Sequence, residues 1–135
     1  DFGFLFLYNY HFTPRQVSVT LPFPGGPRNF HLPSKGRLWM EPLSAMILPL
    51  NLPLAKDVRF LHATAEPLDL RLGRKKMEVV FSSLPGRTVE GALALPKKPR
   101  AVKAGARKLP VRWNRGVLSL SFKAETPETA LTVAL

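Results

Sequence analysis

The sequence predicts an all-β fold, an antiparallel β-sandwich of about a dozen short strands. Fourteen prolines are spread through the 135 residues. No window of about a dozen residues combines helical periodicity with freedom from proline and glycine, so we expect no helix of any length. The segments between these breaks are short, and turn residues recur roughly every 8–12 residues, a pattern typical of sandwiches and barrels.

The first predicted strands surround a proline turn. Residues 4–10 (FLFLYNY) are rich in aromatic and large apolar side chains, which favour a strand. Residues 16–21 (QVSVTL) alternate between apolar and polar side chains, as a half-buried strand does. Thr13-Pro14-Arg15 predicts a turn between them. We therefore expect these two strands to form a hairpin.

Glycine and proline also mark the next segments. Turns are predicted at residues 24–27 (PGGP) and 34–36 (SKG), on either side of a short strand at 30–32. In the run ILPLNLPL, Pro49 and Pro53 each remove a ladder donor, so this segment is expected to be an edge strand or a bulged one.

The rest of the chain continues the pattern. Residues 114–116 (NRG) suit a tight connection, so the strands on either side of them are expected to form a hairpin. Residues 97–100 are the best candidate for a long exposed loop. The remaining predicted strands cover residues 37–40, 45–50, 58–65, 68–72, 76–81, 89–95, 101–103, 111–113, 117–122 and 130–135.

The length is that of one domain, and we treat residues 1–135 as a single sandwich. The chain begins with Asp1 and shows no secretory leader pattern, which favours a piece of a longer, multidomain polypeptide, with a processed natural terminus as the alternative. The apolar runs are short and broken by proline, so no membrane span is expected. There is no cysteine, which excludes disulfides and thiolate metal sites.

The net charge of +11 raises the question of nucleic-acid binding. The 20 lysines and arginines are spread along the chain. The densest stretch, residues 97–108 (KKPRAVKAGARK), lacks the aromatic side chains on which bases stack. We therefore consider nucleic acid an unlikely partner, although the charge favours an acidic surface on a neighbouring domain.

The residues that could carry catalysis show no recognisable arrangement. The nine carboxylates mostly occupy alternating strands or turns, where solvated faces and ion pairs with arginine are the simpler interpretation. The sequence does not exclude a spatial pair suited to cleaving a glycosidic bond. The carboxylates are Asp1, Glu41, Asp57, Glu66, Asp69, Glu78, Glu90, Glu125 and Glu128.

His11, His31 and His62 lack the short spacing of a zinc site, and structural roles are expected for them. There is no GxSxG elbow, no GxxxxGK[ST] loop and no GxGxxG turn. We therefore predict no catalytic, metal or cofactor site within this chain.

Four aromatic residues are the candidates for contact with a carbohydrate. Trp39 and Trp113, with Tyr8 and Tyr10, could present flat rings to a sugar. Each tryptophan alternates with apolar neighbours, so a core position in the sandwich is the alternative interpretation and the one we favour.

Four segments, in this order, resemble the β-sandwich domain that follows the catalytic barrel in family 35 glycoside hydrolases, the β-galactosidases. They are residues 4–10 (FLFLYNY), 32–54 (LPSKG followed by RLWMEPLSAMILPLNLPL), 61–68 (LHATAEPL, with Thr64-Ala65-Glu66) and 86–95, where a glycine turn leads to Glu90. The resemblance covers residues 4–95, and residues 111–122 (VRWNRGVLSLSF) match only a general sandwich style.

The resemblance implies an accessory domain of a hydrolase of carbohydrate metabolism. The family's catalytic acid and nucleophile belong to its barrel, so no catalytic residue is carried over to this chain. Its partners would be that barrel and the other domains of the parent enzyme. The alternatives are an autonomous carbohydrate-binding module and a basic module that binds polyanions, with steep salt dependence.

Overall fold

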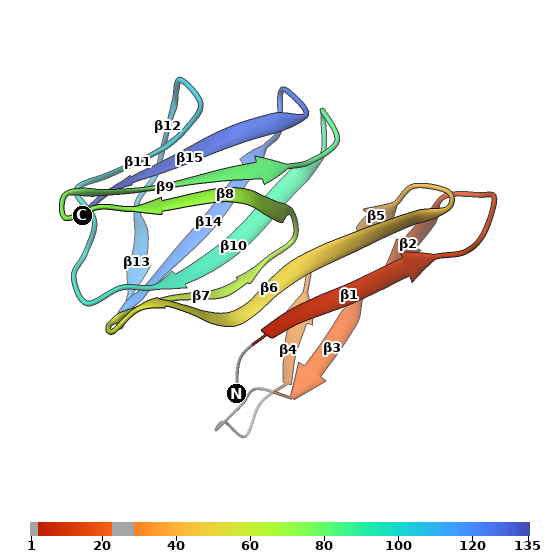
Figure 1. Ribbon diagram of the computed structural model, residues 1–135, viewed down its shortest axis with the longest axis horizontal. Coiled ribbons are helices and arrows are strands. Elements are labelled where there is room, and N and C mark those ends of the chain that lie inside the picture. The colour runs from red at the N-terminus through yellow and green to blue at the C-terminus, as the bar shows by residue number, and fades with distance from the viewer. Residues whose placement is uncertain (1–2, 23–28) are drawn as a thin grey trace.

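Strands make up all the regular secondary structure of residues 3–22 and 29–135, the part of the chain that the computed structural model describes (Figure 1). This confirms the predicted all-β sandwich. Fifteen strands form in these residues. The prediction of about a dozen missed the short strand at Arg107–Leu109, and it joined two strands that separate at Ser18. The predicted turn at residues 24–27 lies outside the described residues.

Two antiparallel sheets form the sandwich. One has the order β1-β6-β7-β10-β14-β13, and the other has the order β12-β11-β15-β9-β8. The strands of the first sheet are β1 (Gly3–Asn9), β6 (Ser44–Ala55), β7 (Val58–Ala63), β10 (Thr88–Ala94), β14 (Val117–Lys123) and β13 (Arg112–Asn114). Those of the second are β12 (Arg107–Leu109), β11 (Ala101–Ala104), β15 (Glu128–Ala134), β9 (Lys76–Ser82) and β8 (Glu66–Leu72).

The main core lies between these two sheets because their strands alternate strictly. In β14, Leu118, Leu120 and Phe122 are buried while the serines between them are exposed. At the centre, Phe81 of β9 meets Phe60 of β7 edge-to-face at 5.8 Å and lies 6.3 Å from Phe122. Aromatic side chains from both sheets therefore fix the spacing of the sandwich.

Residues 3–22 and 29–49 form the N-terminal lobe, and β1 with the first half of β6 extends the six-stranded sheet of the sandwich into this lobe. Beside the β1–β6 pair lie two ribbons: β2 (Arg15–Val17) pairs with β5 (Leu38–Met40), and β3 (Val19–Pro22) pairs with β4 (Asn29–Leu32) (Figure 1). The lobe buries Leu32, Leu38, Met40 and Leu48, which do not belong to the core cluster of the sandwich.

The predicted hairpin between residues 4–10 and 16–21 is wrong. β1 pairs instead with β6, with Leu5 opposite Leu48 and Leu7 opposite Met46. Asn9 is buried where β1 ends, and its side chain bonds to Thr13 and His11 in the following turn. This turn carries the chain away from the β1 sheet, so the next strand joins a different pair.

The prediction of an edge or bulged strand for the ILPLNLPL segment is confirmed in its second alternative, a bulged strand. β6 is interior, but β1 pairs along its first half and β7 along its second, with a register shift between Pro53 and Ala55. The backbone N–H of Ile47 points away from β1 and donates to Glu66. Residues two apart in a strand share this direction, so the nitrogen of Pro49 also points to that open edge, where its missing N–H costs no ladder bond.

The predicted hairpin around residues 114–116 is confirmed. Asn114 pairs with Val117, so Arg115 and Gly116 form a two-residue turn with φ of 45° and 85°. Positive φ at both positions is what a type I′ hairpin requires, and glycine meets it without strain.

Candidate functional site

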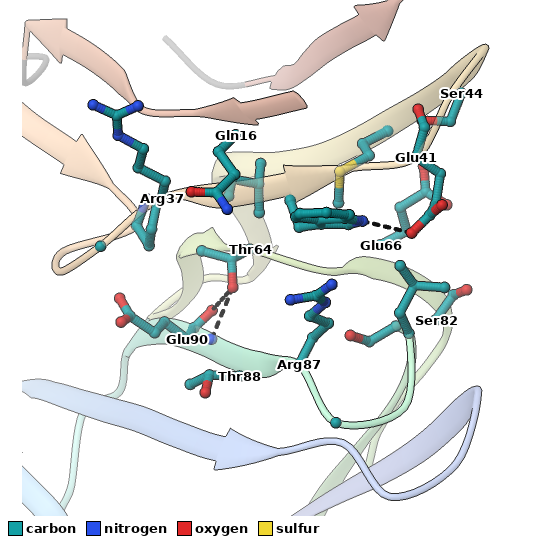
Figure 2. A pocket seen from close by; sticks show the side chains of 18 of the residues that line it. Gln16, Arg37, Glu41, Ser44, Thr64, Glu66, Ser82, Arg87, Thr88 and Glu90 are labelled. Atoms are coloured by element: carbon teal, nitrogen blue, oxygen red, sulfur yellow. Dashed lines mark hydrogen bonds between the residues drawn. The ribbon is translucent and has the colours of Figure 1, made fainter. Parts of the chain in front are cut away.

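A cleft of about 570 Å³ lies between the N-terminal lobe and the sandwich. One wall comes from β2, β5 and residues 33–37 of the lobe. The facing wall comes from residues 82–88, which join β9 to β10, and from β10 itself. In Figure 2, Gln16 and Arg37 project from the first wall, and Arg87, Thr88 and Glu90 lie on the second.

Trp39 enters the cleft because of strand alternation in β5. Leu38 and Met40 are buried in the lobe, so the residue between them points to the opposite side. Its cross-strand partner Gln16 shares that side and also lines the cleft. The tryptophan is half-buried.

The indole ring of Trp39 contacts two charged side chains. The guanidinium carbon of Arg87 lies 4.2 Å from the ring centroid, in a cation–π arrangement. The indole Nε1–H donates to Glu41 Oε1 at 2.5 Å, the bond drawn at the right of Figure 2. One side chain thus orients both a cation and a carboxylate at the mouth of the cleft.

Two further carboxylates in the cleft connect the lobe to the sandwich. Glu66 Oε1, at the start of β8, accepts a hydrogen bond from the backbone N–H of Ile47 in β6 at 2.5 Å. Glu90 Oε2 accepts bonds from both the backbone N–H and the hydroxyl of Ser34 at 2.8 Å. Bonds to carboxylates are stronger than neutral ones, so these contacts help to hold the two walls together.

Thr64 fixes the position of Glu90 on the sandwich side. Its backbone N–H donates to Glu90 O at 2.9 Å, and its hydroxyl accepts from the Glu90 backbone N–H at 2.8 Å. Thr64 follows β7 directly, so its hydroxyl continues the β7–β10 ladder by one residue. The register shift between Ala92 and Leu93 lies further along the same pair.

The cleft has no net formal charge, although the protein carries +11. Lys35, Arg37 and Arg87 line it together with three glutamates, Glu41, Glu66 and Glu90. The ion pairs among the described residues are Arg71–Asp69 and Lys76–Glu78, both outside the cleft. The charged groups of the cleft therefore face it without an ion-pair partner from the described chain.

The four aromatic residues predicted for carbohydrate contact do not meet at one place. Trp39 lies in the cleft, whereas Trp113 is on β13, at the opposite end of the sheet from β1, and packs against the sandwich core. Tyr8 and Tyr10 stack on each other on the outside of the lobe, with ring centroids 5.8 Å apart.

Sequence reasoning missed the other cleft residues, Arg87 and Gln16 among them. The alternation of Trp39 against Leu38 and Met40 was the available signal that its ring leaves the lobe core. The positions of Arg87, Glu66 and Glu90 depend on strands that meet only in the tertiary structure.

A second surface, the aromatic face, covers the outside of β1. It consists of Phe4, Phe6, Tyr8 and Tyr10 with Ile47 of β6, which lies opposite Phe6. These side chains are 42–78% exposed. Phe12 and Leu43 are also exposed, near the turn after β1, where Leu43 N–H donates to His11 O.

The histidines lie apart from the cleft lining. His31 Nδ1 is 3.0 Å from the hydroxyl of Thr20, across the β3–β4 ribbon. His62 lies in β7, and burial lowers its pKa below the ordinary value of 6.5, with the charge of Glu90 acting in the opposite direction. Among residues 3–22 and 29–135, no three side chains of His, Cys, Asp or Glu come close enough together to hold a metal ion.

Comparison of the chain with models of known protein families and with curated proteins found no match. No helix in the described residues has the length and apolar character needed to cross a membrane.

Proposed function

We propose that this chain is a non-catalytic accessory domain of a β-galactosidase-like glycoside hydrolase, and that it packs against the catalytic barrel of that enzyme through its aromatic face. The observation that carries the proposal is the row of exposed Phe4, Phe6 and Tyr8 along one strand. Contiguous exposed apolar surface is characteristic of interaction sites. Phenylalanine and tyrosine are also enriched in interface cores.

The alternation of buried and exposed residues along β1 places its aromatic side chains together on one face. Leu5 and Leu7 turn inward and are half-buried, so the aromatic residues between them must point outward. A strand that only closed the lobe would be expected to carry polar residues at these outward positions.

The edge of β1 that no described strand pairs with also supports docking against a partner domain. β1 is the outermost strand of its sheet, and residues 3–9 contain neither a charge nor a proline. Exposed edge strands usually carry such residues, which prevent unwanted pairing. An edge without them is suited to being covered, and the enzyme's own barrel is the covering partner we propose.

The chemistry of the cleft is consistent with a domain that leaves catalysis to its partner. Glu66 and Glu90 accept hydrogen bonds from backbone donors of the facing lobe, and Glu41 accepts one from the Trp39 indole. The net charge of +11 would favour an acidic surface on the barrel.

The first test is hydrolysis of a chromogenic β-galactoside by this chain alone and by a longer polypeptide that contains it with its barrel. Turnover is expected only from the longer protein. Turnover by the isolated chain would overturn the proposal.

The second test is hydrogen exchange of the β1 amides. We expect strong protection of β1 in the longer protein and faster exchange in the isolated chain. Phe6→Ser should weaken protection in the longer protein, whereas Leu68→Ser, at a side chain of equal 54% exposure on β8, should not. Equal exchange of β1 in both proteins would refute the docking surface.

A further inference from the structure

We infer that the cleft between the lobe and the sandwich binds a neutral saccharide, with Arg87 and Glu41 hydrogen-bonding its hydroxyl groups and Trp39 positioning both. This goes beyond the proposed packing function, because it concerns another surface and a small ligand.

Trp39 contacts a donor, Arg87, through its ring face and an acceptor, Glu41, through its N–H. The guanidinium of Arg87 lies over the ring at 4.2 Å, which restrains its plane and leaves its N–H groups able to donate at the edges. The indole N–H holds Glu41 through Oε1, and the second carboxylate oxygen can still accept a bond. A sugar hydroxyl both donates and accepts, so neighbouring hydroxyls match this pair.

Arg87 and Glu41 are already restrained before a ligand binds, so binding would cost less side-chain conformational entropy. Arg87 is an exposed residue on the turn before β10, and an unrestrained side chain of this length would lose much rotamer freedom on binding. Stacking on Trp39 removes part of that freedom beforehand. Glu41 is similarly restrained by the indole bond and by the turn in which its backbone carbonyl accepts from Asn9 and Ser44.

The charge balance selects a neutral ligand. Three cations and three carboxylates line the cleft, in a protein that is otherwise strongly basic. A polyanion attracted by the cations of the cleft would be repelled by the carboxylates of Glu41, Glu66 and Glu90 in the same cleft. A neutral polyhydroxylated ligand gains bonds from both signs of charge without that repulsion.

The size of the cleft and its two walls fit the same class of ligand. The volume of about 570 Å³ lies in the usual range for small-molecule sites, roughly 300–1,000 Å³. Trp39 and Glu41 belong to the lobe, and Arg87 belongs to the sandwich. A bound saccharide would therefore contact both bodies and stabilise their arrangement.

The test is calorimetric titration of the unmodified 135-residue chain with galactose, lactose and cellobiose, and with galacturonic acid as the charged counterpart of galactose. Sugar concentrations should reach about 10 mM, above the Kd of a weak complex of roughly 1 mM. We expect saturable binding of at least one neutral sugar, and weaker binding of galacturonic acid than of galactose.

Variants locate the binding. Arg87→Ala and Glu41→Gln should each lower the affinity by about tenfold, because each removes bonds to a charged group. Arg112→Ala and Glu125→Gln, matched changes at exposed positions outside the cleft, should leave it unchanged. In Trp113→Phe, Trp39 is the one remaining tryptophan, and its fluorescence should change on titration with the same sugar.

Absence of binding to all three neutral sugars would overturn the inference. Undiminished binding by both Arg87→Ala and Glu41→Gln would also overturn it, and tighter binding of galacturonic acid would refute the neutral class. Because these measurements use the isolated chain, their failure leaves the docking of the aromatic face to be judged by hydrogen exchange.

Discussion

Asn9 is a buried polar residue whose side chain links two turns of the N-terminal lobe. Replacing it with alanine tests how much the stability of the lobe depends on these hydrogen bonds. Its side-chain Nδ2 donates to the carbonyl oxygens of Thr13 at 3.0 Å and Glu41 at 2.9 Å, and its Oδ1 accepts from the His11 N–H at 3.1 Å. It is 4% exposed. One side chain thus joins the turn after β1 to the turn after β5.

The magnitude follows from these three bonds. A hydrogen bond contributes about 1 kcal/mol net, and a buried group left without its partner costs about 1–3 kcal/mol. The two turns lie at the surface, so water can recover part of this loss. We therefore expect Asn9→Ala to lower the free energy of unfolding of the lobe by about 2–3 kcal/mol.

The two tryptophans allow the lobe and the sandwich to be followed separately. Trp39 belongs to the lobe and Trp113 to the sandwich, so Trp113→Phe makes fluorescence report on the lobe and Trp39→Phe makes it report on the sandwich. In urea titrations, Asn9→Ala should move the lobe transition strongly and the sandwich transition little.

Asn29→Ala is the matched control, since Asn29 is an exposed asparagine on β4 of the same lobe, and a change within about 0.5 kcal/mol is expected for it. If Asn9→Ala had an effect as small as this control, the hydrogen-bond argument would be refuted. If both tryptophans reported the same large shift, the lobe would not be energetically separate from the sandwich.

Two further predictions concern the sandwich. Phe81→Ala, at a side chain that contacts both Phe60 and Phe122, should cost about 3–5 kcal/mol in chemical denaturation; Leu68→Ala is the exposed control, and a similar loss in both would contradict the assignment of the core. For His62, burial lowers the pKa in the folded state, so the unfolded chain binds the proton more readily. Stability should therefore be greater at about pH 7.5 than at about pH 5.5, falling as the pH drops below the ordinary value of 6.5 toward the lowered one, and His62→Gln should reduce this difference. An unchanged pH dependence in His62→Gln would show that other groups cause it.

Local sequence patterns were sufficient for most strands. The strand predicted at residues 117–122 corresponds to β14, and the Arg115-Gly116 turn followed from residues adjacent in the chain. Both depend on backbone geometry within a few residues, which the sequence encodes directly. The prolines of β6 predicted a bulge correctly, but the pairing of its two halves with different strands, β1 and β7, could not be predicted from them.

The choice of strand partners could not be predicted in the same way. Alternation determines which side chains of β1 lie on the same face, but Leu5 and Leu7 could pack equally well beside any strand with apolar residues at the facing positions. Closing a longer loop costs little additional entropy, so sequence proximity to residues 16–21 did not decide the pairing. The buried Asn9 and the packing of Leu48 in the lobe accompany the pairing with β6.

The sequence by itself determined that the chain is all-β and where most strands begin and end, whereas the core position that we favoured for Trp39 is wrong, because its ring lies in the cleft on the side opposite Leu38 and Met40. Only the tertiary structure brought Arg87 over the Trp39 ring, placed Glu66 and Glu90 across the seam, and left Phe4, Phe6 and Tyr8 exposed together. The physical reason is that backbone period and turn chemistry act over a few residues, whereas the cleft requires side chains from positions 39, 66, 87 and 90 to meet through packing of separate strands.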